Sequence, residues 1–162
     1  MLLVLLWIAF IFYNSSNNYV TSNQISFKFL NLLKNGKNLV LDKDVKVETN
    51  NKQIYLPTTT RDKKLNLFIR KNAHAFEYII IAVLLSHMLI VHGMRGRDAI
   101  IYILFISLLF AVTDEFHQLF IPGRGSKVSD VIIDFGGTLI GLGSYYLFKF
   151  KLLNLKKPKV LN

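Results

Sequence analysis

The sequence has no cysteine and few acidic residues. Its 162 residues hold 10 aspartates and glutamates against 20 lysines and arginines, which gives a net charge of +10. Without cysteine, a disulfide framework, a thiolate metal site and thiol catalysis are excluded. Fifteen of the basic residues are lysine, which favours contact with anionic lipid over the arginine-rich recognition of nucleic-acid phosphates. We therefore expect membrane lipid, and no nucleic acid, as a partner.

The apolar residues are clustered in four blocks, and the mean hydropathy of +0.36 is high for a water-soluble chain. The blocks cover residues 2–13, 73–91, 99–121 and 128–148. The last three reach the roughly 20 residues that a helix needs to cross a bilayer. The first amounts to about 20 Å of helix. It lacks the basic start and Ala-x-Ala site of a secretory leader, so we expect a membrane helix whose beginning lies upstream of Met1.

The predicted fold is all-α: a four-helix transmembrane bundle that forms a single membrane domain. Residues 1–13 are the first span, 14–72 a polar loop, 73–148 three spans, and 149–162 a basic tail. In the loop, apolar spacing predicts one amphipathic helix over residues 21–34, and a second, basic one from Arg61 that runs into the second block. The Thr21 and Gln24 spacing suggests that Thr21 caps the first helix. Residues 45–56 fit a marginal hairpin or a loose loop.

The basic residues give conflicting signals about orientation. Arg95 and Arg97 lie between the second and third blocks, on the same side as the basic tail if the second, third and fourth blocks all span. The positive-inside rule then places both chain ends in the cytoplasm and the polar loop outside. That loop nevertheless carries 11 of the 20 basic residues. We keep the arrangement with both ends inside as the prediction.

Unusual polar residues mark the three block ends that share the loop's membrane face: the start of the second block, the end of the third and the start of the fourth. They include 5 of the 10 carboxylates. Their spacing of three or four residues puts each set on one helix face, towards neighbouring helices. The set, which we call the polar cluster, consists of Lys71, His74, Glu77, Tyr78, Asp114, Glu115, His117, Gln118, Arg124, Asp130 and Asp134. Ionisable groups within a membrane indicate a site; the alternative is a solvated rim.

Two glycine-containing segments accompany the cluster. The Pro-Gly-Arg-Gly segment from Pro122 predicts a chain reversal. It would hold Arg124 above the cluster, where its guanidinium could clamp a carboxylate or a lipid phosphate. Gly137 and Gly141 form a Gly-x-x-x-Gly face, which we interpret as packing within the chain and not as a dimer interface.

At these residues the chain resembles the VanZ-like family of small bacterial membrane proteins. The pattern Lys-x-x-His-x-x-Glu-Tyr is matched by Lys71, His74, Glu77 and Tyr78. The pattern Asp-Glu-x-x-Gln-x-Phe-x-Pro-Gly-Arg is matched by Asp114, Glu115, Gln118, Phe120, Pro122, Gly123 and Arg124. Asp130, Gly137 and Gly141 fit a third pattern, with Asp134 where the family usually has asparagine. The resemblance implies a multi-pass envelope protein related to teicoplanin resistance, and it supplies no reaction.

The sequence is compatible with three functions. The cluster could engage an amphiphile, such as a lipid-linked cell-wall precursor, a phospholipid headgroup or a lipoglycopeptide. The chain could instead be a membrane-embedded enzyme acting on lipid-linked substrates, or the polar set could only lock the bundle together. No cofactor is expected, because no His-Glu-x-x-His or similar signature is present. The weak candidates for metal ligands are His74, Glu77, Asp114, His117 and Asp130.

Overall fold

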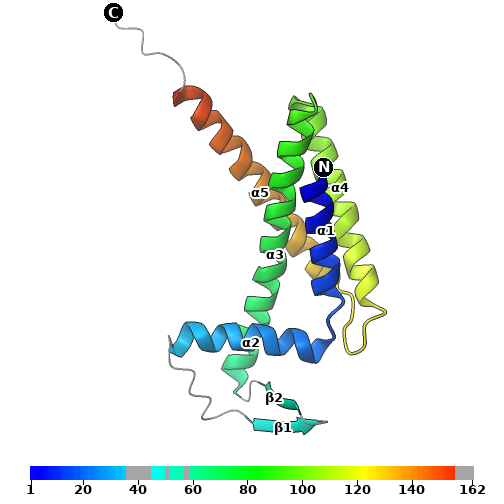
Figure 1. Cartoon of the computed structure of the whole chain (residues 1–162), viewed down its shortest axis with the longest axis vertical. Coiled ribbons are helices and arrows are strands. Elements are labelled where there is room, and N and C mark those ends of the chain that lie inside the picture. Colours follow the sequence, from blue (N-terminus) through cyan, green and yellow to red (C-terminus); the bar gives the residue numbers. More distant parts are fainter. Residues whose placement is uncertain (36–44, 50–51, 57–58, 156–162) are drawn as a thin grey trace, which may run out of the picture.

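The described part of the chain forms five helices and one small hairpin. The computed structural model describes residues 1–35, 45–49, 52–56 and 59–155. The helices are α1 (Leu2–Ser15), α2 (Tyr19–Asn35), α3 (Thr60–Val91), α4 (Gly96–Gln118) and α5 (Val128–Leu155), and the strands are β1 (Val45–Thr49) and β2 (Lys52–Leu56). In Figure 1, α1, α3 and α4 run alongside one another, α2 lies across their lower ends, and α5 crosses α3 and diverges from it.

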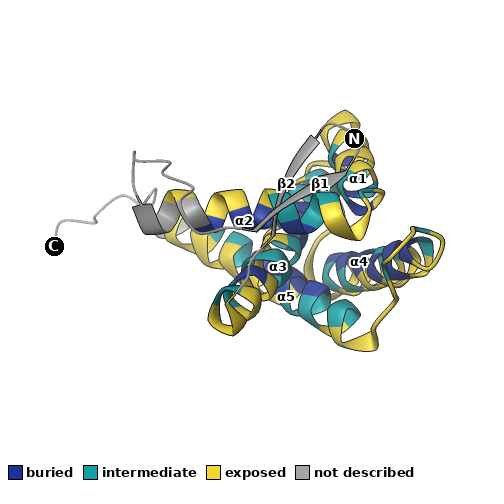
Figure 2. Cartoon of the chain, turned by 90° about the horizontal axis from the view of Figure 1, so that it is seen from below, coloured by how far each residue is buried: buried dark blue, intermediate teal, exposed yellow. Residues whose placement is uncertain are grey.

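Among the described residues, three helices, α3, α4 and α5, are long and apolar enough to cross a membrane. The sequence predicted four spans. α1 is apolar but has only 14 residues, and it packs on α3 and α4. Buried residues line the facing sides of α3, α4 and α5, and exposed residues cover the outside (Figure 2). Those exposed residues include large apolar side chains such as Phe10, Phe105 and Phe148, as expected for helices that meet lipid.

The α3–α5 seam is the most extensive helix contact. It rests on the absence of a side chain at two glycines of α5. A Cβ atom at Gly137 would lie 2.2 Å from the carbonyl oxygen of Ala75, and one at Gly141 would lie 2.4 Å from that of Ile79. Small residues allow this approach of two backbones. The Gly-x-x-x-Gly face is therefore used within the chain.

The helix α2 is amphipathic, as predicted. Phe27 and Leu30 are buried, while Ile25 and Phe29 on another face are more than half exposed, at 57% and 52%. The predicted cap was wrong: the side chain of Asn18 accepts the Thr21 backbone N–H at 2.8 Å, so the helix begins at Tyr19. An Asn at this position satisfies a helix-start N–H that has no partner within the helix.

The basic helix expected after Arg61 is the first part of α3, which continues without a break to Val91. The hairpin interpretation of residues 45–56 is confirmed: β1 and β2 pair antiparallel, with Val47 opposite Ile54. The predicted reversal between α4 and α5 is also present, with Gly123 at a φ of 74°, which glycine adopts readily. Residues 36–44 of the loop and 156–162 of the basic tail lie outside the described residues.

Candidate functional site

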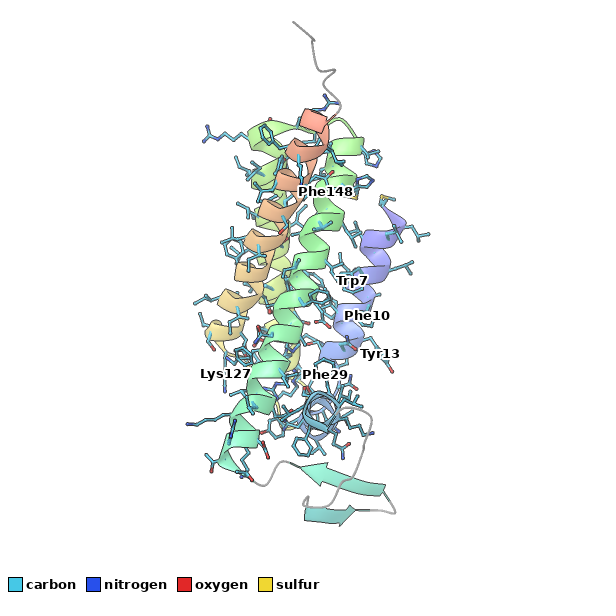
Figure 3. All side chains as sticks on the ribbon, turned by 90° about the vertical axis from the view of Figure 1, so that its left-hand side faces the viewer. Trp7, Phe10, Tyr13, Phe29, Lys127 and Phe148 are labelled. Carbon is cyan, nitrogen blue, oxygen red and sulfur yellow. The ribbon has the colours of Figure 1, made fainter. Side chains whose placement is uncertain are left out.

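The polar cluster lies where the end of α1, the first half of α3, the end of α4 and the start of α5 meet. In Figure 3 this is the end marked by Lys127 and by Phe29 of α2, while Phe148 lies towards the opposite end. Alternating directions of successive helices bring these segments to one level of the bundle. α1 contributes two residues, Trp7 and Asn14, that were not predicted from the sequence.

Glu77 of α3 is the point at which α1 is attached. Its Oε1 accepts a hydrogen bond from Asn14 Nδ2 at 2.8 Å, and its Oε2 lies 3.4 Å from His74 Nδ1. The backbone oxygen of Glu77 accepts a second bond from α1, from Trp7 Nε1 at 3.0 Å. Asn14 and Trp7 are thus site residues that the sequence reasoning missed. The signal available was that Trp7 is the chain's one tryptophan and Asn14 the first polar residue after the apolar run.

Lys71 and Asp130 join α3 to α5. Lys71 Nζ lies 2.6 Å from Asp130 Oδ1, and both side chains are about three-quarters buried, at 28% and 22% exposure. Ser129 Oγ donates to the same carboxylate oxygen at 3.0 Å. The pair lies at the edge of the cluster, where partial burial reduces the screening that weakens an exposed ion pair.

Arg124 binds α1 and not a carboxylate. Its Nη1 donates to the backbone oxygens of Ser15 at 2.7 Å and Asn17 at 3.4 Å, and its Nη2 lies 3.5 Å from His74 Nε2. The prediction that this guanidinium clamps a carboxylate is therefore wrong. The last carbonyls of a helix lack donors within the helix and carry partial negative charge, which suits a cation. Burial, followed by repulsion from Arg70, lowers the pKa of Arg124 from its ordinary value.

The end of α4 supplies two further polar contacts. His117 Nε2 lies 3.1 Å from Ser16 Oγ, which adds a polar link between α4 and the residue that follows α1. The Gln118 side-chain amide donates to Asp114 Oδ2 at 3.0 Å, and Asp114 is fully buried.

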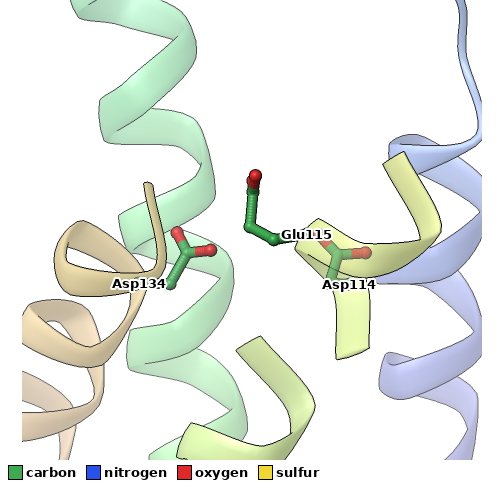
Figure 4. Close-up of side chains that lie close together, drawn as sticks. All are labelled: Asp114, Glu115 and Asp134. Carbon is green, nitrogen blue, oxygen red and sulfur yellow. The ribbon is translucent and has the colours of Figure 1, made fainter. Parts of the chain in front are cut away.

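Three carboxylates form the centre of the cluster. Asp114 and Glu115 of α4 face Asp134 of α5 (Figure 4), and one oxygen atom from each lies within 4.8 Å of the others. We call them the acid triad. Of the five metal ligands suggested from the sequence, only Asp114 belongs to it. His74, Glu77, His117 and Asp130 are instead paired at other points of the cluster.

A basic groove opens beside the cluster, between α2 and the first turns of α3. It has a volume of about 530 Å³ and is lined by residues that include Lys63, Lys64, Arg70 and Tyr19. The Arg70 guanidinium lies over the Tyr19 ring, 5.6 Å from its centroid. Arg70 also lines a smaller cavity of about 120 Å³ that reaches His74 and Glu77. The groove and the cluster are therefore neighbours, with Arg70 at the boundary.

A comparison with protein families gives a match over most of the chain. The sequence profile described as VanZ/LLP1 matches residues 1–149. The chain belongs to the VanZ/LLP1 family. The match takes in α1 and α2 as well as the motif-bearing helices, so the VanZ/LLP1 unit includes the segments that attach to Glu77 and Arg124. Among curated proteins and among solved structures, no match was found.

Proposed function

We propose that this VanZ/LLP1 protein binds the anionic head of an envelope amphiphile at one membrane boundary. The observation that carries the proposal is the basic groove between α2 and α3. Lys63, Lys64 and Arg70 line it together with Tyr19, and its lining contains no acidic side chain among the described residues. Lysines near a membrane surface attract anionic headgroups by about 1 kcal/mol each.

The placement of α2 supports an occupant that is part of a membrane. α2 lies across the bundle (Figure 1), and its side chains Ile25, Phe29 and Leu32 are exposed. A helix with an apolar face on one side and polar residues on the other lies in the membrane interface with its apolar face among the acyl chains. An amphiphile beside α2 would keep its tail in lipid while its head enters the groove.

The smaller cavity brings the groove and the cluster together in this proposal. Arg70, which lines the groove, also lines this cavity together with His74 and Glu77. A phosphate or carboxylate in the groove would meet Lys63 and Lys64 first and the guanidinium of Arg70 last. The Arg124 guanidinium would not contact the headgroup. It would hold the end of α1 and the link to α2 in place through the backbone oxygens of Ser15 and Asn17.

We place α1 as a fourth, short span, with both chain ends in the cytoplasm and the cluster on the outer side. Arg95 and Arg97 support this orientation, because they lie at the far end of the bundle. Three of the 11 basic residues of the polar loop, Lys63, Lys64 and Arg70, are explained by the ligand in this proposal, since they line the groove. An outer-face ligand is a lipid-linked cell-wall precursor, a phospholipid or a lipoglycopeptide. Binding of any of these connects the chain to teicoplanin-type resistance or envelope homeostasis.

The test is binding of short-chain lipids to the purified chain in a zwitterionic detergent. Dioctanoyl phosphatidylglycerol is expected to bind, while dioctanoyl phosphatidylcholine and inorganic phosphate bind far more weakly. Lys63→Gln with Lys64→Gln removes about 2 kcal/mol of attraction and is expected to weaken the binding of phosphatidylglycerol roughly 30-fold. In cells, the same variant is expected to lose the resistance that the wild-type gene restores to a deletion strain.

The matched control is Arg95→Gln with Arg97→Gln, which removes the same charge at the opposite end of the bundle. It is expected to leave lipid binding unchanged. The proposal fails if Lys63→Gln with Lys64→Gln binds phosphatidylglycerol as the wild type does, or if both double variants lose binding equally, because then only net charge matters.

A second function, a purely structural one for the cluster, is favoured by its internal bonds. The Asn14–Glu77, Lys71–Asp130 and Arg124–Ser15 contacts all join different elements. Under this alternative, variants of the cluster would change resistance only in proportion to the amount of protein in the membrane. Lys63 and Lys64 lie outside these contacts, so their substitution separates the two functions.

A further inference from the structure

The acid triad carries more negative charge than its surroundings neutralise. Asp114, Glu115 and Asp134 are 0%, 3% and 2% exposed. Each can place one oxygen within 4.8 Å of the others. Like charges at this separation in a medium of low dielectric constant repel strongly, and buried ions without partners are costly. The triad therefore needs protons or a cation.

The described residues supply mainly neutral partners. Gln118 donates to Asp114 through its amide at 3.0 Å, and Lys127 donates to Glu115 through its backbone N–H at 2.9 Å. Within the described part of the chain, no hydrogen bond or salt bridge joins a cationic side chain to the triad. Arg124 and His74 interact with the triad only at longer range, and both make their close contacts elsewhere.

Unpartnered oxygen atoms face the same space. Asp134 Oδ1 has no hydrogen-bond partner among the described residues. Tyr78 of α3 is fully buried, its hydroxyl is also unpartnered among the described residues, and the charges of Asp114 and Asp134 act on that hydroxyl. A buried hydroxyl without a partner is rare. The unpartnered hydroxyl of Tyr78 is therefore a second observation, besides the three carboxylates, that indicates a ligand at the acid triad.

We propose that the acid triad binds one divalent cation of the class that prefers oxygen ligands, namely Mg²⁺, Mn²⁺ or Ca²⁺. The ligands are one carboxylate oxygen each from Asp114, Glu115 and Asp134, with the Tyr78 hydroxyl beside them. An ion with bonds of about 2.0–2.6 Å keeps its ligand atoms within about 5 Å of one another, and the three carboxylate oxygens lie within 4.8 Å of one another. The ion joins α4 to α5 beside the turn between them, where the Lys127 backbone N–H donates to Glu115. The cation site does not rest on the proposed headgroup binding.

The experiment uses the full chain in phosphatidylcholine nanodiscs, stripped with a chelator and titrated with Mn²⁺. Loss of the electron paramagnetic resonance signal of free Mn²⁺ reports binding. One Mn²⁺ per chain is expected, displaced by Mg²⁺ or Ca²⁺. Asp134→Asn is expected to weaken binding at least tenfold, since even residues that only orient metal ligands commonly change affinity by about 10–100-fold. The exposed carboxylate at the opposite end, removed by Asp98→Asn, serves as the matched control.

A second variant keeps the test informative if Asp134→Asn does not fold. Tyr78→Phe keeps the ring and the carboxylates, and it is expected to weaken Mn²⁺ binding while retaining helical content. Lys63→Gln with Lys64→Gln is expected to bind Mn²⁺ normally, so failure of headgroup binding and failure of the cation site give different results. The proposal is overturned if the wild type binds no Mn²⁺ up to about 1 mM, the weak end of protein Ca²⁺ sites, or if Asp134→Asn binds it as tightly as the wild type.

Discussion

Replacing Gly137 by alanine is expected to destabilise the bundle by about 3 kcal/mol, at the upper end of the usual cost of an added methyl group in a packed interior. The new Cβ atom would lie 2.2 Å from the backbone oxygen of Ala75 and 3.0 Å from the carbonyl carbon. A flexible side chain could move away, but this oxygen belongs to the backbone of α3, so the two helices must separate. The free energy of unfolding, measured by titrating the detergent-solubilised chain with sodium dodecyl sulfate, checks the effect.

The same helix provides controls for this substitution. A Cβ atom at Gly136 or Gly143 meets nothing within 4 Å. Gly136→Ala and Gly143→Ala are expected to leave stability unchanged or raise it by about 0.5–1 kcal/mol, because alanine is the better helix former. If Gly137→Ala were as stable as Gly136→Ala, the close contact of α3 and α5 would be wrong.

Removal of the Glu77 side chain is expected to loosen α1 from the bundle. Glu77→Ala leaves Asn14 Nδ2 without its acceptor and His74 without its nearest carboxylate. A hydrogen bond to a charged group contributes about 1.5–3 kcal/mol, so a loss of about 2–3 kcal/mol in unfolding free energy is expected. The fluorescence of Trp7, which donates to the Glu77 backbone oxygen, reports locally whether α1 has moved.

Two control variants separate the loss of the Asn14–Glu77 bond from the loss of a charge. Glu77→Gln keeps an oxygen for Asn14 and is expected to retain most of the stability. Asp98→Ala removes an exposed carboxylate at the opposite end and is expected to cost well under 1 kcal/mol. An equal loss in all three variants would show that charge alone, and not the Asn14–Glu77 bond, stabilises the site.

The sequence predicted the long helices because their apolar runs are long and end at polar residues. α3 and α4 follow from this alone. The sequence also predicted that the polar residues lie at the same end of the bundle, because successive spanning helices run in opposite directions. These two features were enough to identify the residues of the polar cluster as a group.

The pairing within the cluster could not be predicted, because it depends on how each helix is rotated about its axis. Arg124 illustrates the difficulty. Its partners are backbone oxygens of Ser15 and Asn17, which every sequence offers equally and which become acceptors only where a helix ends. The attachment of α1 through Asn14 was missed for a related reason: a single polar residue after a short apolar run carries no spacing information.

The grouping of the acid triad could not be predicted from the sequence either. Asp130 and Asp134 lie four residues apart and looked like a pair along one helix face. In the structure Asp130 turns to Lys71, and Asp134 joins Asp114 and Glu115. Asp130 forms a salt bridge at the edge of the cluster, whereas the more deeply buried Asp134 lies beside the carboxylates of α4. Such a choice between partners on α3 and α4 depends on packing and not on spacing.

Thiol cross-linking in native membranes tests the central claim, the meeting of helix ends in one cluster, most directly. The chain has no cysteine of its own, so paired cysteines can be introduced without background. Ser16→Cys with His117→Cys and Lys71→Cys with Asp130→Cys replace contacts of 3.1 Å and 2.6 Å between α1 and α4 and between α3 and α5. Both pairs are expected to react rapidly with a short bis-methanethiosulfonate reagent, while Ser16→Cys with Arg97→Cys does not. Equal, slow cross-linking of all three pairs would contradict the account.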